Sequence, residues 1–287
     1  MILNETYTLS GGIQIPKLGL GTWLIDDDKV AQTVRDAVKI GYRHIDTAEA
    51  YENERGVGEG VRTCGLPRDE IFVTTKLAAE MKTYQDAVAA IDESLRKMDI
   101  GYIDLMLIHS PQPWAKFRED KRSYDGGNLE AWRALEDAVK AGKLRSIGIA
   151  NFEQPDIDNL LSGCTIRPAV NQVLAHISNT PHELIAYSES KGIKVEAYSP
   201  IAHGKILKNP EIENMAEKYG VTVPQICIRY TLQLGLISLP KTGNPDHMRS
   251  NADVDFTISD EDMKSLMAME KIRDYGEYSY FPVFSGK

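Results

Sequence analysis

Short apolar runs alternate repeatedly with longer amphipathic ones along this chain, and few folds accommodate such an alternation. Runs such as EIFVTTK (70–76) and YIDLMLIH (102–109) are rich in apolar and β-branched residues, which is typical of strands buried on both faces. Between such runs lie stretches such as residues 27–41, in which Ala31, Val34 and Val38 recur at helical spacing. About eight strand–helix units follow one another along residues 17–253.

Right-handed crossovers repeated this often close most naturally into a (β/α)8 (TIM) barrel, whose usual size is about 250 residues. We therefore expect residues 1–287 to form one barrel domain. The competing architecture is an open doubly wound sheet, which would carry a G-x-G-x-x-G turn after an early strand. GVGEG (56–60) lies inside a helical pattern and lacks the final glycine. Ahead of the barrel, TYTL (6–9) and IQIPK (13–17) flank a Ser-Gly-Gly turn and predict a β-hairpin.

Composition narrows the classes of partner. The formal net charge of -9 argues against general affinity for nucleic acid or anionic membranes. No apolar stretch reaches the ~18 residues that span a bilayer, and the first residues do not resemble a signal peptide, so a cytoplasmic protein is expected. Cys64, Cys164 and Cys227 are far apart, and His176 and His182 form the one close histidine pair, so we expect reduced thiols and no metal site.

Four titratable residues fall at or near the ends of predicted strands. Asp46 ends the second strand, Lys76 the third and His109 the fourth, while Tyr51 follows Asp46 in the next loop. Each alone has an ordinary interpretation, as a helix cap, a solvated lysine, a satisfied core histidine or a loop tyrosine. Because the carboxyl ends of barrel strands meet at one mouth, together they predict a catalytic site.

These side chains suit proton transfer to a carbonyl oxygen as it is reduced. A tyrosine hydroxyl has an ordinary pKa of ~10, and a nearby ammonium favours its phenolate form and lowers the pKa. Lys76 is expected to supply that charge, Asp46 to hold Lys76 charged, and His109 to position the substrate oxygen. The set supplies no hydride, so a cofactor is implied.

The motifs also resemble those of a known family. GYRHIDTAEAYENERGVG (41–58), VTTK, DLMLIH, GIANF, NQV, AYSP and PKTG are similar, in this order and across residues 5–270, to the aldo-keto reductase family, in particular its bacterial diketogluconate reductase and aldehyde reductase-like branch. The resemblance implies that Asp46, Tyr51, Lys76 and His109 are the catalytic residues and that Tyr51 is the general acid and base.

The resemblance also implies a set of cofactor-binding residues. They would hold the nicotinamide carboxamide, stack on its ring, grip the pyrophosphate and surround the adenosine end of NADPH: Asn151, Gln172, Tyr198, Ser199, Ile201, Lys241, Thr242, His247 and Asn251.

Several positions depart from the family pattern. Ala150 stands where a serine often precedes the asparagine of GIANF, and NQVLAH replaces a run that usually contains glutamate and an aromatic residue. His247 occupies the place of an arginine that would contact the 2′-phosphate or adenine, and Arg249, two places further along a helix, points elsewhere. Because Lys241 and Thr242 are kept, NADPH is the expected cofactor, with NADH as a possible second one.

Aromatic residues surround the expected mouth of the barrel. By resemblance Trp23 and Trp114 line a pocket for a small-molecule carbonyl substrate. The C-terminal tail adds four more aromatic residues: Tyr275, Tyr278, Tyr280 and Phe281. They could join this wall or pack a terminal extension against the barrel, and both interpretations stay open. The irregular loop at 111–128 is long enough to be functional. Small aldehydes, α-keto or dicarbonyl compounds and sugar-acid ketones all remain candidate substrates, and a monomer or weak homo-oligomer is expected.

Two other functions fit parts of the pattern. Barrels of this family also serve as non-catalytic regulatory or structural subunits, although the intact set of four residues argues against that role. An aldolase could use Lys76 as a Schiff base, but that chemistry needs a lysine with a lowered pKa, and Asp46 should raise it.

Overall fold

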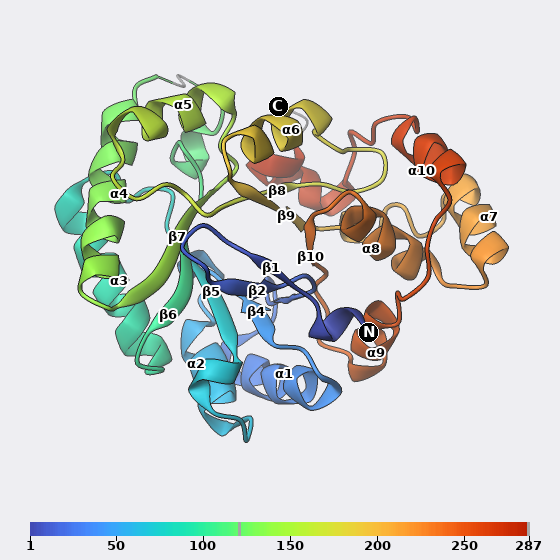
Figure 1. Ribbon diagram of the computed structural model, residues 1–287, viewed down its shortest axis with the longest axis horizontal. Helices are drawn as coiled ribbons and strands as arrows, with labels where there is room; N and C mark the ends of the chain where they lie inside the picture. Colours follow the sequence, from blue (N-terminus) through green and yellow to red (C-terminus); the bar gives the residue numbers. More distant parts are fainter. Residues whose placement is uncertain (120–121, 286–287) are drawn as a thin grey trace.

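Eight parallel strands form the centre of the molecule, and each pairs with the next along the chain (Figure 1). The computed structural model describes residues 1–119 and 122–285. The strands are β3 (Leu20–Gly21), β4 (His44–Asp46), β5 (Phe72–Leu77), β6 (Ile103–Ile108), β7 (Leu144–Ala150), β8 (Val170–Leu174), β9 (Lys194–Tyr198) and β10 (Ile237–Leu239). Parallel bridges Leu18–Ser238 and Gly21–Lys241 join the two ends of the sheet. The predicted (β/α)8 barrel is therefore confirmed.

Helices surround the strands. They are α1 (Asp27–Ile40), α2 (Glu54–Thr63), α3 (Tyr84–Met98), α4 (Asp125–Lys140), α5 (Gln154–Gly163), α6 (His182–Ser190), α7 (Pro210–Tyr219), α8 (Val223–Gln233), α9 (Pro245–Ala252) and α10 (Asp260–Met267). The sequence interpretation missed α10, whose eight residues bury the apolar side chains of Met263 and Leu266. Two such positions are too few for a helical period, although Ser259 accepts a hydrogen bond from the Asp262 backbone and caps this helix.

The predicted hairpin closes one end of the barrel. β1 (Thr6–Thr8) and β2 (Gln14–Pro16) pair antiparallel and lie across the barrel in Figure 1. Leu9 and Ile15 are buried in a cluster with Phe72 and Leu105 from the strands. The hairpin thus covers the amino ends of the strands and leaves their carboxyl ends for the site.

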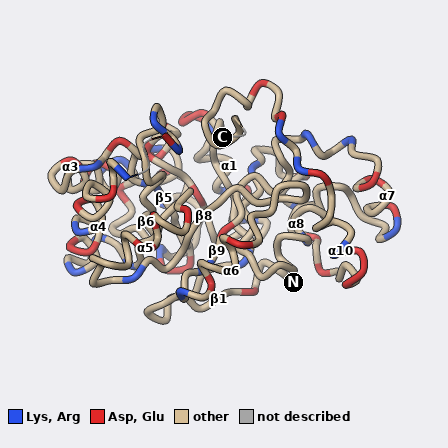
Figure 2. Tube along the Cα trace, turned by 90° about the horizontal axis from the view of Figure 1, so that it is seen from above, with Lys and Arg blue, Asp and Glu red and all other residues tan. Residues whose placement is uncertain are grey.

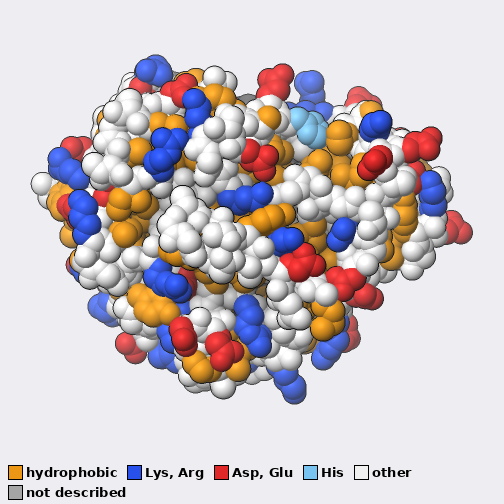
Figure 3. Space-filling model, in the orientation of Figure 1, with side chains coloured by type: hydrophobic (Ala, Val, Ile, Leu, Met, Phe, Trp, Pro, Cys, Tyr) orange, Lys and Arg blue, Asp and Glu red, His pale blue; other side chains and the backbone are white. Residues whose placement is uncertain are grey.

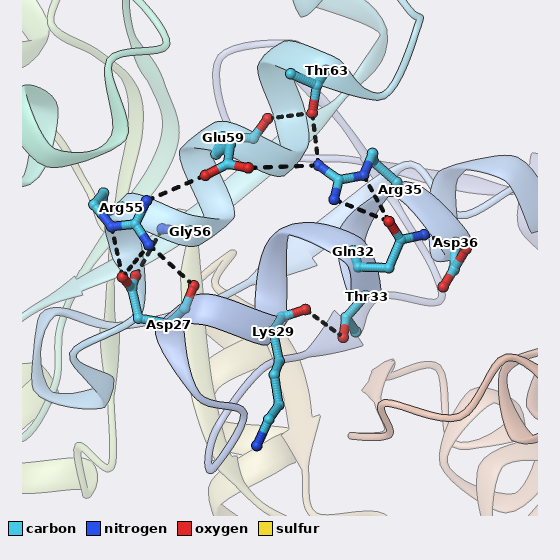
Figure 4. Close-up of polar contacts among 10 residues, drawn as sticks. All are labelled: Asp27, Lys29, Gln32, Thr33, Arg35, Asp36, Arg55, Gly56, Glu59 and Thr63. Carbon is cyan, nitrogen blue, oxygen red and sulfur yellow. Dashed lines mark hydrogen bonds and ion pairs between the residues drawn. The ribbon is translucent and has the colours of Figure 1, made fainter.

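Close packing of α1 against α2 explains the glycines of GVGEG. A Cβ atom at Gly56 would lie 2.2 Å from the carbonyl oxygen of Asp27, and one at Gly60 would lie 2.6 Å from the Cβ of Val34. The carboxylate of Asp27 accepts a hydrogen bond from the Gly56 backbone at 2.8 Å and pairs with Arg55 (Figure 4). The glycines serve helix packing, which agrees with their placement inside a helical pattern.

Charged residues lie mainly on the outer helices and loops (Figure 2). On the face seen in Figure 3, acidic and basic groups are interspersed with apolar ones. Across the described ranges, no helix combines the length and apolar character needed to cross a membrane. Within the same residues, no three His, Cys, Asp or Glu side chains gather as a metal site would require.

Candidate active site

The four predicted catalytic residues meet at the carboxyl ends of the strands. Asp46 is the last residue of β4, Lys76 lies near the end of β5, His109 follows β6, and Tyr51 ends the short 3-10 helix Glu49–Tyr51. The Lys76 Nζ atom lies 2.7 Å from Asp46 Oδ1, 2.8 Å from the Thr47 carbonyl oxygen and 3.3 Å from the Tyr51 hydroxyl. A continuous chain of hydrogen bonds therefore links the aspartate to the tyrosine.

The environment of Lys76 keeps it charged. Its side chain is only 1% exposed, and this burial disfavours the ammonium form. The Asp46 carboxylate and the Tyr51 hydroxyl outweigh burial, so the pKa of Lys76 is raised above its ordinary value. This direction agrees with the expectation from the sequence, and it disfavours the aldolase alternative, which needs a neutral amine.

The expected lowering of the Tyr51 pKa was wrong as a net effect. Burial is the largest influence and raises the pKa of Tyr51, and the charge of Asp46 raises it too. Lys76 lowers it as predicted but does not outweigh burial. Tyr51 therefore holds its proton firmly, as a proton donor must before reaction.

His109 is an uncharged neighbour of the tyrosine. Burial and the Lys76 ammonium hold the pKa of His109 well below its ordinary value. Its ring meets Tyr51 edge-on at 5.8 Å between centroids and Trp114 at 5.0 Å. No donor or acceptor in the described residues reaches its buried Nδ1 atom. A neutral imidazole can still donate a hydrogen bond to a substrate oxygen.

A cavity of about 600 Å³ lies beside the predicted catalytic residues. Its lining includes three of them, Asp46, Tyr51 and His109. Both predicted substrate-binding tryptophans, Trp23 and Trp114, also line it. Part of the predicted cofactor set lines it as well: Asn151, Gln172, Tyr198, Ser199, Ile201 and Lys241. The sequence predictions for the substrate and for the inner part of the cofactor thus converge on one space.

Asn151 and Tyr198 are hydrogen-bonded to each other in the lining of this cavity. The Tyr198 hydroxyl donates to Asn151 Oδ1 at 2.7 Å, and Asn151 Nδ2 donates to the His109 carbonyl oxygen at 2.9 Å. Asn151 adopts a left-handed backbone conformation with φ 61°. Such conformations are costly and concentrate at functional sites.

The loop after β9 is strained where it lines the cavity. Ser199, Ala202 and His203 all have left-handed backbones, with φ of 52°, 48° and 52°. His203 was not among the predicted site residues, yet it lines the cavity and its Nε2 atom lies 3.2 Å from Ser199 Oγ. Burial lowers the pKa of His203 to about 4. Its position two residues after Ile201, in the loop that follows the AYSP motif, was the signal that could have identified it.

The outer cofactor residues are less closely assembled. Lys241 lines the cavity, whereas Thr242, His247 and Asn251 are outside its lining. Thr242 and Asn251 are buried, and His247 is exposed on α9. Arg249 pairs with Asp246 at 2.8 Å, in agreement with the expectation that it points elsewhere.

The tail aromatics divide between the two interpretations left open by the sequence. Tyr278 and Phe281 line the cavity, and so does Phe284, which the sequence interpretation omitted although it belongs to the same aromatic run. Tyr275 is buried against the barrel, and its hydroxyl is hydrogen-bonded to His176 Nε2 at 2.8 Å. Tyr280 is 75% exposed. Loop 111–128 also contributes, through Trp114 in the 3-10 helix Trp114–Lys116, while its residues 120 and 121 lie outside the described residues.

The fold and this site define a class of protein, a barrel oxidoreductase with a lysine-supported tyrosine at the mouth of its cavity. The chain belongs to the aldo/keto reductase family, whose sequence pattern matches residues 17–271. It is 38% identical to the glyoxal reductase of Bacillus subtilis over 271 residues, 94% of each chain. It is 37% identical to the glycerol 2-dehydrogenase (NADP(+)) of Saccharomyces cerevisiae, covering 93% of this chain and 91% of that one.

Solved structures agree with the sequence comparisons. The aldo-keto reductase of Bombyx mori, in complex with NADP, superposes with a TM-score of 0.84 at 34% identity and covers 98% of each chain. The aldose reductase of Schistosoma japonicum gives a TM-score of 0.86 at 31% identity, over 99% of this chain and 97% of that one. The predicted class of enzyme, a reductase of carbonyl groups, is confirmed, and the non-catalytic alternative gains no support.

Proposed function

We propose that this protein reduces aldehydes or ketones to alcohols with NADPH and that Tyr51 delivers the proton. The observation that carries this proposal is the hydrogen-bonded chain from Asp46 through Lys76 to Tyr51, which ends at the cavity. When bound, the nicotinamide cofactor supplies a hydride to the carbonyl carbon. The carbonyl oxygen then becomes negative, and the chain's own residues position and protonate it.

Each catalytic residue has a physical role in this reaction. Tyr51 donates its proton to the carbonyl oxygen, and the adjacent Lys76 ammonium stabilises the phenolate that remains. Asp46 keeps Lys76 charged and oriented. His109, neutral because its pKa is lowered, donates a hydrogen bond that positions the oxygen.

The cavity's chemistry fits a nicotinamide dinucleotide. Asn151 and Gln172 present amide groups beside the catalytic residues, Tyr198 offers an aromatic face, and the strained loop from Ser199 leads away from them. Among the described residues, Lys241 is the one lysine or arginine that lines the cavity, and it would meet the 2′-phosphate of NADPH. Because His247 is exposed and uninvolved in the lining, we infer that NADH is accepted as a weaker second cofactor.

The substrate is best described as an uncharged carbonyl compound with an apolar group. Trp23, Trp114 and Phe281 provide aromatic walls near Tyr51. No arginine of the described residues lines the cavity, and its one lysine, Lys241, is assigned to the cofactor phosphate. No further cation among the described lining residues would pair with a substrate carboxylate or phosphate.

Turnover tests the proposal directly. Purified protein should oxidise NADPH when small aromatic and aliphatic aldehydes are added, and Tyr51→Phe should lower kcat at least about 100-fold. The same variant should bind NADPH nearly as well as the unaltered protein, because the lost hydroxyl acts on the substrate. Retained turnover by Tyr51→Phe would remove the tyrosine from this role.

Cofactor choice has its own test. The ratio of kcat/KM for NADPH to that for NADH should exceed one, and Lys241→Ala should lower it about tenfold, since a charged hydrogen bond to the phosphate is lost. Arg249→Ala is the matched control and should leave the ratio unchanged, because Arg249 pairs with Asp246. A preference of the unaltered protein for NADH would contradict the proposal.

A further inference from the structure

A second buried carboxyl group lies behind the catalytic residues. Glu196 on β9 is the register partner of Gln172 on β8, and its side chain is fully buried. Gln172 Nε2 donates to Glu196 Oε2 at 2.9 Å and also to Asp46 Oδ2 at 2.8 Å. One amide nitrogen therefore bridges the catalytic aspartate and a glutamate that the proposed mechanism does not use.

These two contacts determine which way the Gln172 amide faces. An amide nitrogen carries two N–H donors, and both carboxyl groups offer oxygen acceptors. If the amide were turned over, its oxygen would face two carboxyl oxygens, and buried donors would be lost. The Gln172 amide nitrogen therefore faces the two carboxyl groups in the interior of the barrel.

The amide oxygen of Gln172 remains for the cavity. Gln172 lines the cavity, and no donor in the described ranges bonds its Oε1 atom. An acceptor in this position is complementary to the NH2 group of a carboxamide, and it offers nothing to a methyl group.

We propose that Glu196 is a positioning residue that fixes the Gln172 amide with its oxygen toward the cavity, where it selects the carboxamide NH2 of the nicotinamide ring. The role of Glu196 rests on the proposed function, since it presumes that a nicotinamide cofactor occupies the cavity. Asp46 binds one N–H of the amide, and Glu196 binds the other. Without Glu196 one buried N–H has no acceptor, and the preference for this orientation weakens.

The protonation of Glu196 is compatible with this role. Burial, and next the charge of Asp46, raise the pKa of Glu196 to about 8. With its proton on Oε1, which has no hydrogen-bond partner in the described residues, Oε2 still accepts from Gln172. A neutral glutamine at position 196 would keep such an acceptor, whereas leucine would remove it.

The test compares two probes that differ at the carboxamide. Isothermal titration gives Kd for NADP+ and for its 3-acetylpyridine analogue, in which a methyl group replaces the NH2. The unaltered protein should bind NADP+ more tightly, with a ratio of the two Kd values of about 3 to 10, the worth of one hydrogen bond. Glu196→Leu should lower the ratio toward one, since only Asp46 then orients the amide, and Glu196→Gln should retain most of it.

Several outcomes would overturn the role of Glu196. They are a ratio of one in the unaltered protein, an unchanged ratio in Glu196→Leu, and a Glu196→Gln variant that behaves like Glu196→Leu. The first of these needs no variant, so the proposal stays falsifiable even if Glu196→Leu does not fold. Failure of the unaltered protein to bind either dinucleotide would instead contradict the proposed function, which keeps the two conclusions separate.

Discussion

Lys76 is the residue on which the electrostatics of the site depend, and its removal should be seen in a pH profile. Lys76→Met takes away the ammonium that lowers the pKa of Tyr51, so that pKa should rise further. We expect kcat for aldehyde reduction to fall by about 100-fold or more. In the residual activity, the decline at alkaline pH should move to higher pH, because the more weakly acidic tyrosine stays protonated longer. The measurement is kcat against pH with NADPH saturating.

Folding must be separated from catalysis in this variant. Lys76→Met leaves the Asp46 carboxylate buried without its cation, which can cost about 3–5 kcal/mol of stability. The double variant Asp46→Asn/Lys76→Met removes both charges and should fold more stably than the single one. If the folded double variant kept the kcat and the alkaline limb of the unaltered protein, the role of Lys76 would be wrong.

Single residues also mark where sequence reasoning stops. Asp46, Lys76 and His109 could be predicted because strand ends in a barrel converge whatever the details of packing. The net pKa shift of Tyr51 could not, since burial depends on neighbours from several loops. Glu196 could have been singled out, because it is a charged residue on a buried strand. It lies two positions before Tyr198 and therefore on the same face of that strand. Its link to Gln172 required knowledge of the strand register.

At the scale of elements, α2 depends on a glycine for its contact with the end of α3. A Cβ atom at Gly58 would lie 2.0 Å from the Met98 carbonyl oxygen, and backbone cannot move aside as a flexible side chain can. Gly58→Ala should therefore lower the free energy of unfolding by about 1–3 kcal/mol, despite alanine's higher helix propensity. Urea denaturation followed by circular dichroism measures this change.

Gly126 is the matched control for that substitution. It lies in the first turn of α4, and an added Cβ would meet no atom of the described residues within 4 Å. Gly126→Ala should leave stability unchanged or raise it by up to about 1 kcal/mol, as helix propensity alone predicts. Equal destabilisation by the two substitutions would rule out the close contact as the cause.

The C-terminal tail is the element least accessible to sequence reasoning, since it has no periodic pattern and its aromatics fit either of two roles. The structure divides it into the 3-10 helices Gly276–Tyr280 and Pro282–Phe284. Phe281 meets Trp23 edge-on at 4.8 Å between ring centroids. Phe284, only 1% exposed, packs at 4.4 Å from His203. The tail thus completes the cavity wall, a long-range contact that local sequence does not encode.

Truncation of the tail's aromatic wall should weaken substrate binding more than chemistry. Phe281→Ala removes the contact with Trp23, and KM for an aromatic aldehyde should rise about tenfold, while kcat changes little. Met267→Ala is the control because Met267 is exposed and outside the cavity lining. Steady-state kinetics of the two variants make the comparison. A fall in kcat with KM unchanged would contradict a role in substrate binding.

At the scale of the whole molecule, the buried Glu196 couples the protonation of the barrel interior to its stability. Its pKa is about 8 in the folded protein, against an ordinary value of 4.5. The folded state therefore holds this proton more tightly than the unfolded state, so the stabilising contribution is complete below about pH 4.5 and is lost as pH rises toward 8. Each pH unit in this window costs about 1.4 kcal/mol.

Glu196→Gln should abolish this dependence, because glutamine does not titrate. Between pH 5 and pH 8 the free energy of unfolding of the variant should rise relative to that of the unaltered protein, by a few kcal/mol in total, as the pKa shift of Glu196 implies. The difference should level off at higher pH. Urea denaturation across this range measures it, with Glu183→Gln on the exposed surface of α6 as the control for removal of a charge. Parallel stability curves for Glu196→Gln and the unaltered protein would mean that Glu196 is ionised throughout. Within the described residues, the interior would then hold two carboxylates on one glutamine, with Lys76 as the one cation paired with them.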